Sequence, residues 1–121
     1  MIDFDIVLKD FIFISGLSED EAKKQSNLIN LSIDYVVNNL KPGVDINSNL
    51  NLLSMLSASI AYHKYVFIKE SLNSSSSVKL GDISITSNSQ SSIKIADTLK
   101  NEFISSASHL LLSPNFIFRQ V

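Results

Sequence analysis

The spacing of apolar residues along the chain predicts a mainly α-helical protein. Apolar residues recur at steps of three and four positions in four stretches, approximately residues 4–14, 18–40, 50–72 and 93–112, and this is the spacing of one helix face. In the third stretch the apolar residues cover most of the helix circumference, which places that helix at the centre of the fold. The expected fold is therefore a small bundle of about four helices.

Residues that begin and end helices stand at the borders of these stretches. Asp3 and Ser18 have side chains that can accept a hydrogen bond from a free N–H group of the first turn. Ser18 is followed three positions later by Glu21, which is the pattern of a capping box. Gly16 is expected to end the first helix, and Pro42-Gly43 to end the second.

The apolar faces of the three longest helices predict the core. Residues that occupy these faces are expected to be buried together, because each helix turns one face toward the others. The predicted core consists of Ile33, Val36, Leu53, Leu56, Ile60, Leu99 and Phe103.

Helical spacing is interrupted by a serine-rich stretch at residues 73–92. At its centre, Val78-Lys79-Leu80 and Ile83-Ser84-Ile85 alternate apolar with polar residues on either side of Gly81-Asp82. Alternation with period two around a two-residue Gly-X loop predicts a short β-hairpin between the third and fourth helices. A hairpin of this length is marginal alone in water. Its apolar residues, Val78, Leu80, Ile83 and Ile85, must therefore rest either on the chain's own helices or on another chain.

The chain of 121 residues has the length of one domain, so residues 1–121 are expected to form a single unit. Three helices would occupy residues 1–72, the hairpin residues 73–92, the fourth helix residues 93–112 and a tail residues 113–121. In an extended tail Phe116 and Phe118 would point the same way and Arg119 would point away from them. This arrangement suits an arm that contacts another subunit, and the alternative is that the rings fold back over the chain's own helices.

Composition narrows the classes of partner. Apolar residues make up 45% of the chain and charged residues 18%, with a net charge of −2, so the chain is globular and lacks a broad cationic surface for nucleic acid. Cysteine is absent, which excludes disulfides and thiolate metal sites. The apolar runs are too short to span a bilayer, and Asp3 and Asp5 stand where a signal peptide carries basic residues. We expect a soluble intracellular protein without a membrane partner.

The residues that could carry chemistry do not form a catalytic pattern. His63 and His109 are far apart in the sequence, belong to no metal-binding motif, and are expected to be partly exposed helix residues. The serine cluster at residues 74–77 lacks the Gly-x-Ser-x-Gly sequence of a nucleophile elbow. The sequence therefore predicts a protein that is not an enzyme and has no catalytic residues, cofactor or metal.

Four stretches in this order resemble one protein family. They are SGLSEDEA at the end of the first helix, SASIAYHKY in the third helix, the ribbon SSSSVKLGDISIT and the ending LLSPNFIFRQV. Together they resemble the head-tail connector, or head-completion adaptor, proteins of tailed bacteriophages and prophages, and the resemblance covers nearly the whole chain. It implies a homo-oligomeric ring of about a dozen copies in which one face of each copy meets a different face of the next.

The resemblance also implies partners and a location. The ring would lie beneath the portal protein, extend the DNA channel without recognising sequence, and present a platform to the next neck or tail-completion protein. The protein would be in the host bacterial cytoplasm before assembly and in the virion neck afterwards. The resemblance does not identify the contact residues. The residue pattern itself suggests that contacts with other subunits or with the portal are made by Val78, Leu80, Ile83, Ile85, Phe116, Phe118 and Arg119.

A second hypothesis belongs to a different class of protein. The same sequence suits a small cytosolic helical-bundle regulator or adaptor that acts as a dimer and whose hairpin folds on its own helices. A mass measurement distinguishes the two hypotheses, because a large ring, alone or with portal, supports the connector.

Overall fold

The structure is a computed structural model that describes residues 2–77 and 83–112, with the backbone alone for residues 73–77 and 83–91. All regular structure in these residues is helical. The α-helices are α1 (Phe4–Ser15), α2 (Glu19–Lys23), α3 (Ser26–Asn38), α4 (Leu50–Ser77) and α5 (Ile83–Ser106). Two 3₁₀ turns accompany them, η1 (Asn47–Asn49) before α4 and η3 (Ser108–Leu110) after α5. The prediction of a mainly helical bundle is confirmed.

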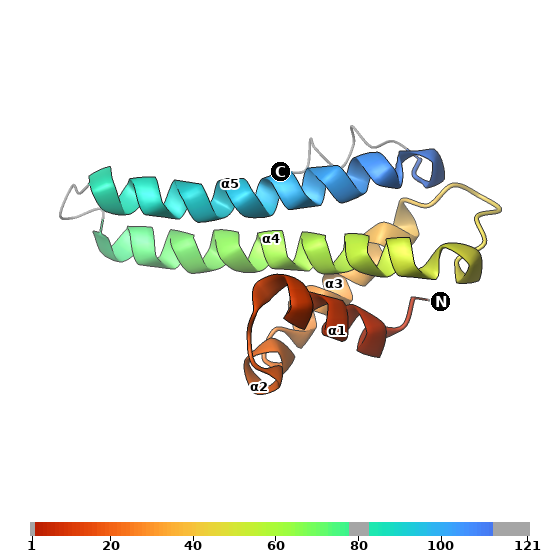
Figure 1. Ribbon diagram of the computed structural model, residues 1–121, viewed down its shortest axis with the longest axis horizontal. Helices are drawn as coiled ribbons and strands as arrows, with labels where there is room; N and C mark the ends of the chain where they lie inside the picture. The colour runs from red at the N-terminus through yellow and green to blue at the C-terminus, as the bar shows by residue number, and fades with distance from the viewer. Residues whose placement is uncertain (1, 78–82, 113–121) are drawn as a thin grey trace.

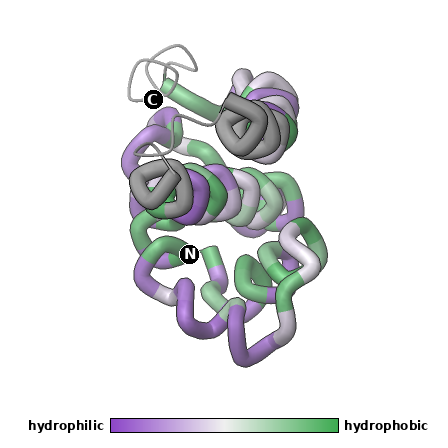
Figure 2. The backbone as a smooth tube through the Cα atoms, turned by 90° about the vertical axis from the view of Figure 1, so that its left-hand side faces the viewer, coloured by the Kyte–Doolittle hydropathy of each residue, from purple (hydrophilic) through white to green (hydrophobic). Residues whose placement is uncertain are grey.

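Helix α4 lies at the centre of the molecule, as predicted for the third helix. Helix α5 runs antiparallel to it along one side, and α1 and α3 pack against its other side (Figure 1). Seen along the long axis, α5, α4 and the layer of α1–α3 follow one another from top to bottom (Figure 2). The far ends of α4 and α5, at Ser77 and Ile83, extend beyond the α1–α3 layer (Figure 1).

The predicted ends of the first helix are confirmed. The Asp3 carboxylate accepts a hydrogen bond from the N–H of Asp5 (2.9 Å) at the start of α1. Gly16 follows the helix with a φ of 72°, a left-handed conformation that glycine adopts without strain. The Ser18 hydroxyl oxygen likewise accepts from the N–H of Glu21 (3.2 Å) at the start of α2. The side chain of Glu21 contacts Lys24 (3.2 Å between Oε1 and Nζ).

The predicted helix over residues 18–40 is divided in two, which corrects the sequence prediction. Helix α2 ends at Lys23 and α3 begins at Ser26. Between them Gln25 leaves helical geometry, with φ −97° and ψ 20°, and the Ser26 hydroxyl donates to the Lys23 carbonyl. A serine hydroxyl that takes a backbone carbonyl competes with the helical hydrogen bonds. The apolar pattern did not reveal the break, because the buried positions after it still keep helical spacing.

The predicted hairpin is not supported, and the fourth helix begins earlier than expected. Helix α4 continues to Ser77 and α5 begins at Ile83, so the expected second strand, Ile83–Ile85, is the first turn of a helix. The expected first strand, Val78–Leu80, lies outside the described residues. Serine is only a moderate helix former but does not break a helix. Extending two helices that already pack together adds hydrogen bonds along an existing ladder, whereas an isolated two-stranded hairpin is marginal.

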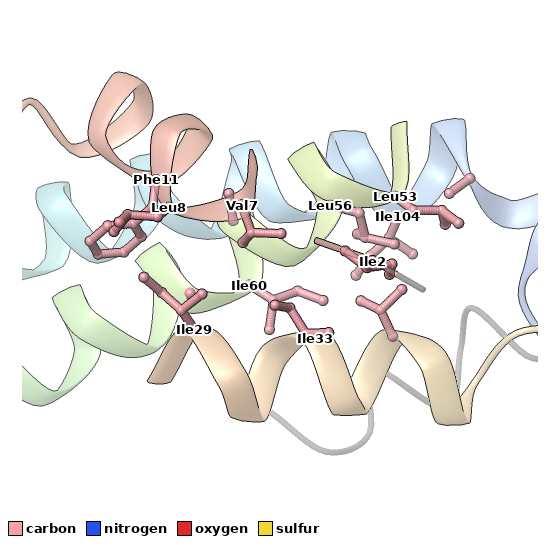
Figure 3. Packing of buried hydrophobic residues seen from close by; sticks show 14 of the residues in the cluster. Ile2, Val7, Leu8, Phe11, Ile29, Ile33, Leu53, Leu56, Ile60 and Ile104 are labelled. Carbon is pink, nitrogen blue, oxygen red and sulfur yellow. The ribbon is translucent and has the colours of Figure 1, made fainter. Parts of the chain in front are cut away.

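The core lies where α1, α3, α4 and α5 meet (Figure 3). Of the predicted core residues, Ile33, Val36, Leu53, Leu56 and Ile60 are buried. Phe103 is half-buried and packs against the core, and Leu99 is half-buried on α5. The buried positions of α5 are those of Ala96, Lys100 and Ile104, and Ala107 directly after the helix is also buried. The predicted core residues of α5 are thus only partly buried, and a lysine occupies one of the fully buried positions of this helix.

A pair of backbone hydrogen bonds, here called the clasp, joins the end of α3 to the segment after α5. The N–H of Lys41 donates to the Leu110 carbonyl (2.8 Å), and the N–H of Leu112 donates to the Asn39 carbonyl (2.7 Å). Leu40 and Leu111 form the antiparallel bridge between these bonds. The clasp therefore fixes the C-terminal end of α5 against the α1–α3 layer.

Candidate functional site

Two of the predicted contact residues lie in the part of the chain that the structure describes. Ile83 and Ile85 lie in the first turn of α5, where two positions apart means about 200° apart around the helix. They therefore do not share a face, as they would in a strand. The other predicted contact residues, Val78, Leu80, Phe116, Phe118 and Arg119, lie outside the described residues.

A polar cluster lies between α4 and α5, inside the molecule. His63 of α4 and Lys100 of α5 are only 6% and 2% exposed. Both face Asp97 of α5, with His63 Nε2 at 3.5 Å and Lys100 Nζ at 3.4 Å from the same carboxylate oxygen. The side chain of Asp97 is 44% exposed and connects the cluster to water. The Asp97 carboxylate is thus the shared partner of two buried side chains, His63 and Lys100.

Burial decides the protonation of this cluster. Burial is the main cause that lowers the pKa of His63 below 6.5, and the charge of Lys100 lowers it further, although Asp97 acts in the opposite direction. Burial also lowers the pKa of Lys100, against the effect of Asp97. A buried ammonium group is costly unless it is paired and hydrogen-bonded. The Lys100 ammonium lies 3.4 Å from the Asp97 carboxylate, at ion-pair distance, and this contact partly offsets the effect of burial on its pKa.

The burial of the cluster limits what it can do chemically. A substrate would reach Asp97 but not His63 or Lys100, whose side chains are enclosed between the helices. The ring of Phe67 lies beside His63, with centroids 6.4 Å apart. Among the described residues no group of three or more His, Cys, Asp or Glu side chains is placed to hold a metal ion. The arrangement suits a structural role, in which the cluster sets how α4 and α5 pair.

Sequence reasoning missed this cluster. His63 was expected to be partly exposed and is buried, whereas His109 is exposed as expected. One signal was present in the sequence. Lys100 stands four residues after Ala96 and four before Ile104, in the middle of an apolar row with helical spacing. A lysine at such a position predicts a buried amine and hence a carboxylate nearby.

Large apolar side chains are exposed along the α4–α5 pair. Phe67 and Ile68 are 47% and 48% exposed, and Leu72 is 66% exposed, all in the half of α4 toward Ser77. Ile95, near the middle of α5, is 66% exposed. Clustered apolar residues on a surface mark sites of protein contact.

A groove lies where α4 passes the junction of α2 and α3. Its apolar lining comes from Leu28 of α3 and from Tyr65, Ile68 and Leu72 of α4, and Lys24, Gln25, Asn27 and Lys69 complete it. The Lys69 ammonium lies over the Tyr65 ring, 5.9 Å from its centroid. The groove therefore combines apolar side chains with two lysines.

A second hollow lies on the outer side of α5. It is lined by Lys94, Ile95, Thr98, Leu99 and Glu102, all of which come from this one helix. Ile95 and Leu99 supply its apolar part, and the remaining residues are exposed.

Comparisons with known proteins identified no relative of this chain. Neither a protein-family model, nor a curated protein, nor a solved structure matches this chain. The described helices include none with the length and apolar character needed to cross a membrane. The class of protein that the fold defines is a small helical bundle built around α4.

Proposed function

We propose that this protein is a structural head-tail connector of a tailed bacteriophage or prophage. In this proposal copies of the chain assemble as a ring beneath the portal protein, and DNA passes through the ring without sequence recognition. The next neck or tail-completion protein binds the opposite side. The protein works in the virion neck and is in the host bacterial cytoplasm before assembly. The ordered sequence stretches that resemble this family, together with the helical fold, support the proposal.

The exposed apolar surface of the α4–α5 pair is the observation that carries the proposal. Phe67, Ile68 and Leu72 follow one another along the part of α4 that leads to its far end. A monomer gains nothing from apolar side chains in water at these positions, whereas an assembled protein buries them against a neighbour. The far ends extend beyond α1–α3, so a neighbouring subunit has access to them (Figure 1).

The groove at the junction of α2 and α3 suits contact between unlike surfaces. A ring forms when one surface of each copy meets a different surface of the next. In the proposed ring, the groove lined by Leu28, Tyr65 and Ile68 receives an apolar segment of the neighbouring copy. Lys69 in its lining favours a segment that carries an acidic residue, whereas Lys24 is already paired with Glu21.

The predicted contact residues retain their proposed role. The segment that contains Val78, Leu80, Ile83 and Ile85 connects α4 to α5 at the far end of the pair, where it would meet the portal or a neighbouring subunit. In the tail, Phe116 and Phe118 would anchor in an apolar pocket of a partner, and Arg119 would pair with a carboxylate there.

Mass measurement of the full-length chain, alone and mixed with the portal protein of the same genome, tests the proposal. We expect a ring of many copies, formed alone or on the portal. Ile68→Asp should abolish it, because a carboxylate would be buried in the interface. Leu31→Asp is the matched control, since Leu31 is 59% exposed on α3, away from the α4–α5 pair.

Two outcomes would contradict the connector proposal. One is a chain that stays monomeric in the presence of portal. The other is a stable dimer that does not bind portal, which would favour the dimeric regulator. Adjacent portal, major capsid and tail genes are expected in the genome, and their absence would also count against the connector.

A further inference from the structure

Helix α5 carries an apolar row on the flank beside its buried positions Ala96, Lys100 and Ile104. The row consists of Ile95, Leu99 and Phe103, which stand four residues apart and so lie above one another on the helix. Phe103 packs against the core, Leu99 is half-buried, and Ile95 is 66% exposed. Exposure is therefore greatest at Ile95, the residue of the row that lies farthest from the C-terminal end of α5.

The described helices leave the Ile95 end of this row uncovered. In the part of the chain that the structure describes, α5 packs mainly on α4 and η3. Among the described residues, those that line the hollow over Ile95 and Leu99 all belong to α5. A single helix supplies only one wall of a hollow, so an apolar segment from elsewhere is needed to cover these side chains.

The chain's own tail begins within reach of the row. Leu112 is the last described residue, and its hydrogen bond to Asn39 holds it near the C-terminal end of α5. An extended chain places Phe116 about 13 Å and Phe118 about 20 Å beyond Leu112. Along α5, Leu99 is about 10 Å and Ile95 about 16 Å from Ser106. A tail that turns back along α5 can therefore bring each ring to one of these residues.

The spacing of the two rings matches the spacing of the row. Phe116 and Phe118 lie on one side of an extended segment, about 7 Å apart. Leu99 and Ile95 are separated by about 6 Å along the helix axis. Two rings can thus lie over two aliphatic side chains at once, with Phe116 on Leu99 and Phe118 on Ile95.

We propose that residues 115–118 of the same chain cover the apolar row of α5 in the unassembled protein. The tail binds its own helix in preference to that of another copy. A short tether gives it an effective concentration of about a millimolar or more, above the working concentration of a second copy. The tail then shields both its own rings and the row from water until a partner takes its place. This inference concerns the single chain and does not depend on the connector proposal.

Methyl NMR of the full-length protein tests the proposal. The rings of Phe116 and Phe118 should shift the methyl signals of Ile95 and Leu99 upfield. The double substitution Phe116→Ala and Phe118→Ala should return both signals toward their random-coil positions. Ile117→Ala is the matched control, because its side chain would point away from α5 in an extended tail and its loss should leave the signals unchanged. The methyl groups of Leu31, exposed on α3, should not respond to any of these changes.

Dilution separates the proposed arrangement from an exchange of tails between copies. If each tail covers its own row, the upfield shifts of Ile95 and Leu99 should not change with protein concentration. Shifts that disappear on dilution would overturn the proposal, because the rings would then come from a second copy. Signals that do not respond to loss of the two rings would overturn it as well. All of these variants alter the tail alone, so none requires refolding of the core.

Discussion

Leu56 and Ile60 are the residues on which the core depends most directly. Leu56 is fully buried and Ile60 is 3% exposed, and both lie on α4 in the core cluster. Replacing either by alanine should lower the free energy of unfolding by about 2–5 kcal/mol, because the lost methyl groups leave a cavity. Urea unfolding measures this loss. Leu31→Ala is the control, and an equally small effect at all three sites would mean that α4 is not central.

His63 should make stability depend on pH. Its folded pKa is lowered, chiefly by burial, whereas the unfolded chain binds a proton at about 6.5. The stabilising contribution of the neutral ring is therefore fully present above about pH 6.5 and is lost as the pH falls below it. The groups around the ring are Asp97 and Lys100 of α5 and Lys64 of α4.

The comparison of two histidine variants measures this effect. Wild-type protein should lose more stability than His63→Gln between about pH 7.5 and about pH 5.5. His109→Gln should behave like wild type, because His109 is exposed. Equal pH dependence in wild type and His63→Gln would show that the ring is not held in its neutral form.

Residue patterns predicted burial well on α3 and α4 but not on α5. The stripes of α3 and α4 consist of apolar residues, so their period shows directly which face is inward. On α5 the row of Ile95, Leu99 and Phe103 is as regular as the true inward row, which contains Lys100. Apolar character alone favoured the wrong row. The long aliphatic stem of lysine explains how Lys100 occupies the other row.

At the scale of elements, the early start of α5 is the prediction that a substitution can test. Ser89 lies inside α5 in the structure but in the serine-rich linker predicted from the sequence. Proline at this position removes a helical hydrogen bond and clashes with the preceding turn. Ser89→Pro should therefore lower the helix content measured by far-UV circular dichroism.

A second proline variant serves as the control. Ser84→Pro lies in the first turn, where the N–H group has no partner within the helix, so it should leave helix content nearly unchanged. If Ser89→Pro also leaves the spectrum unchanged, α5 does not extend to Ile83.

The sequence predicted the helix boundaries at which one residue caps or ends the helix through its own side chain or backbone. Asp3, Gly16 and Ser18 act on the backbone next to them, and all three are where they were expected. The division at Gln25 and the extension of α5 through the serine-rich stretch have no such local mark. They depend on packing between helices, which outweighs the modest helix propensity of serine.

At the scale of the whole molecule, deletion of the tail, residues 115–121, should affect assembly far more than it affects stability. Deleting residues 115–121 should leave helix content unchanged, because the core and the clasp end at Leu112. Thermal stability should fall only slightly, by the contribution of the tail's surface contact with Ile95 and Leu99. The deletion should abolish association into a ring or with portal, because the two phenylalanine anchors are lost. Thermal unfolding and mass measurement of the same sample provide both readouts. A truncated protein that melts well below the full chain would show that the tail belongs to the core.

The clasp has a mechanical consequence for the α4–α5 pair. One end of the pair is fixed by the hydrogen bonds of Lys41 and Leu112, whereas the other end extends beyond α1–α3 (Figure 1). A force on the free end of the pair would therefore rotate α4 and α5 about the core around α4. A load applied near Ser77 would twist α4 against α1 and α3, and the clasp would resist that twist. Backbone amides of the pair should therefore exchange most slowly near the clasp, where hydrogen bonds hold the helices. Exchange should become faster toward Ser77, where the pair extends beyond α1–α3.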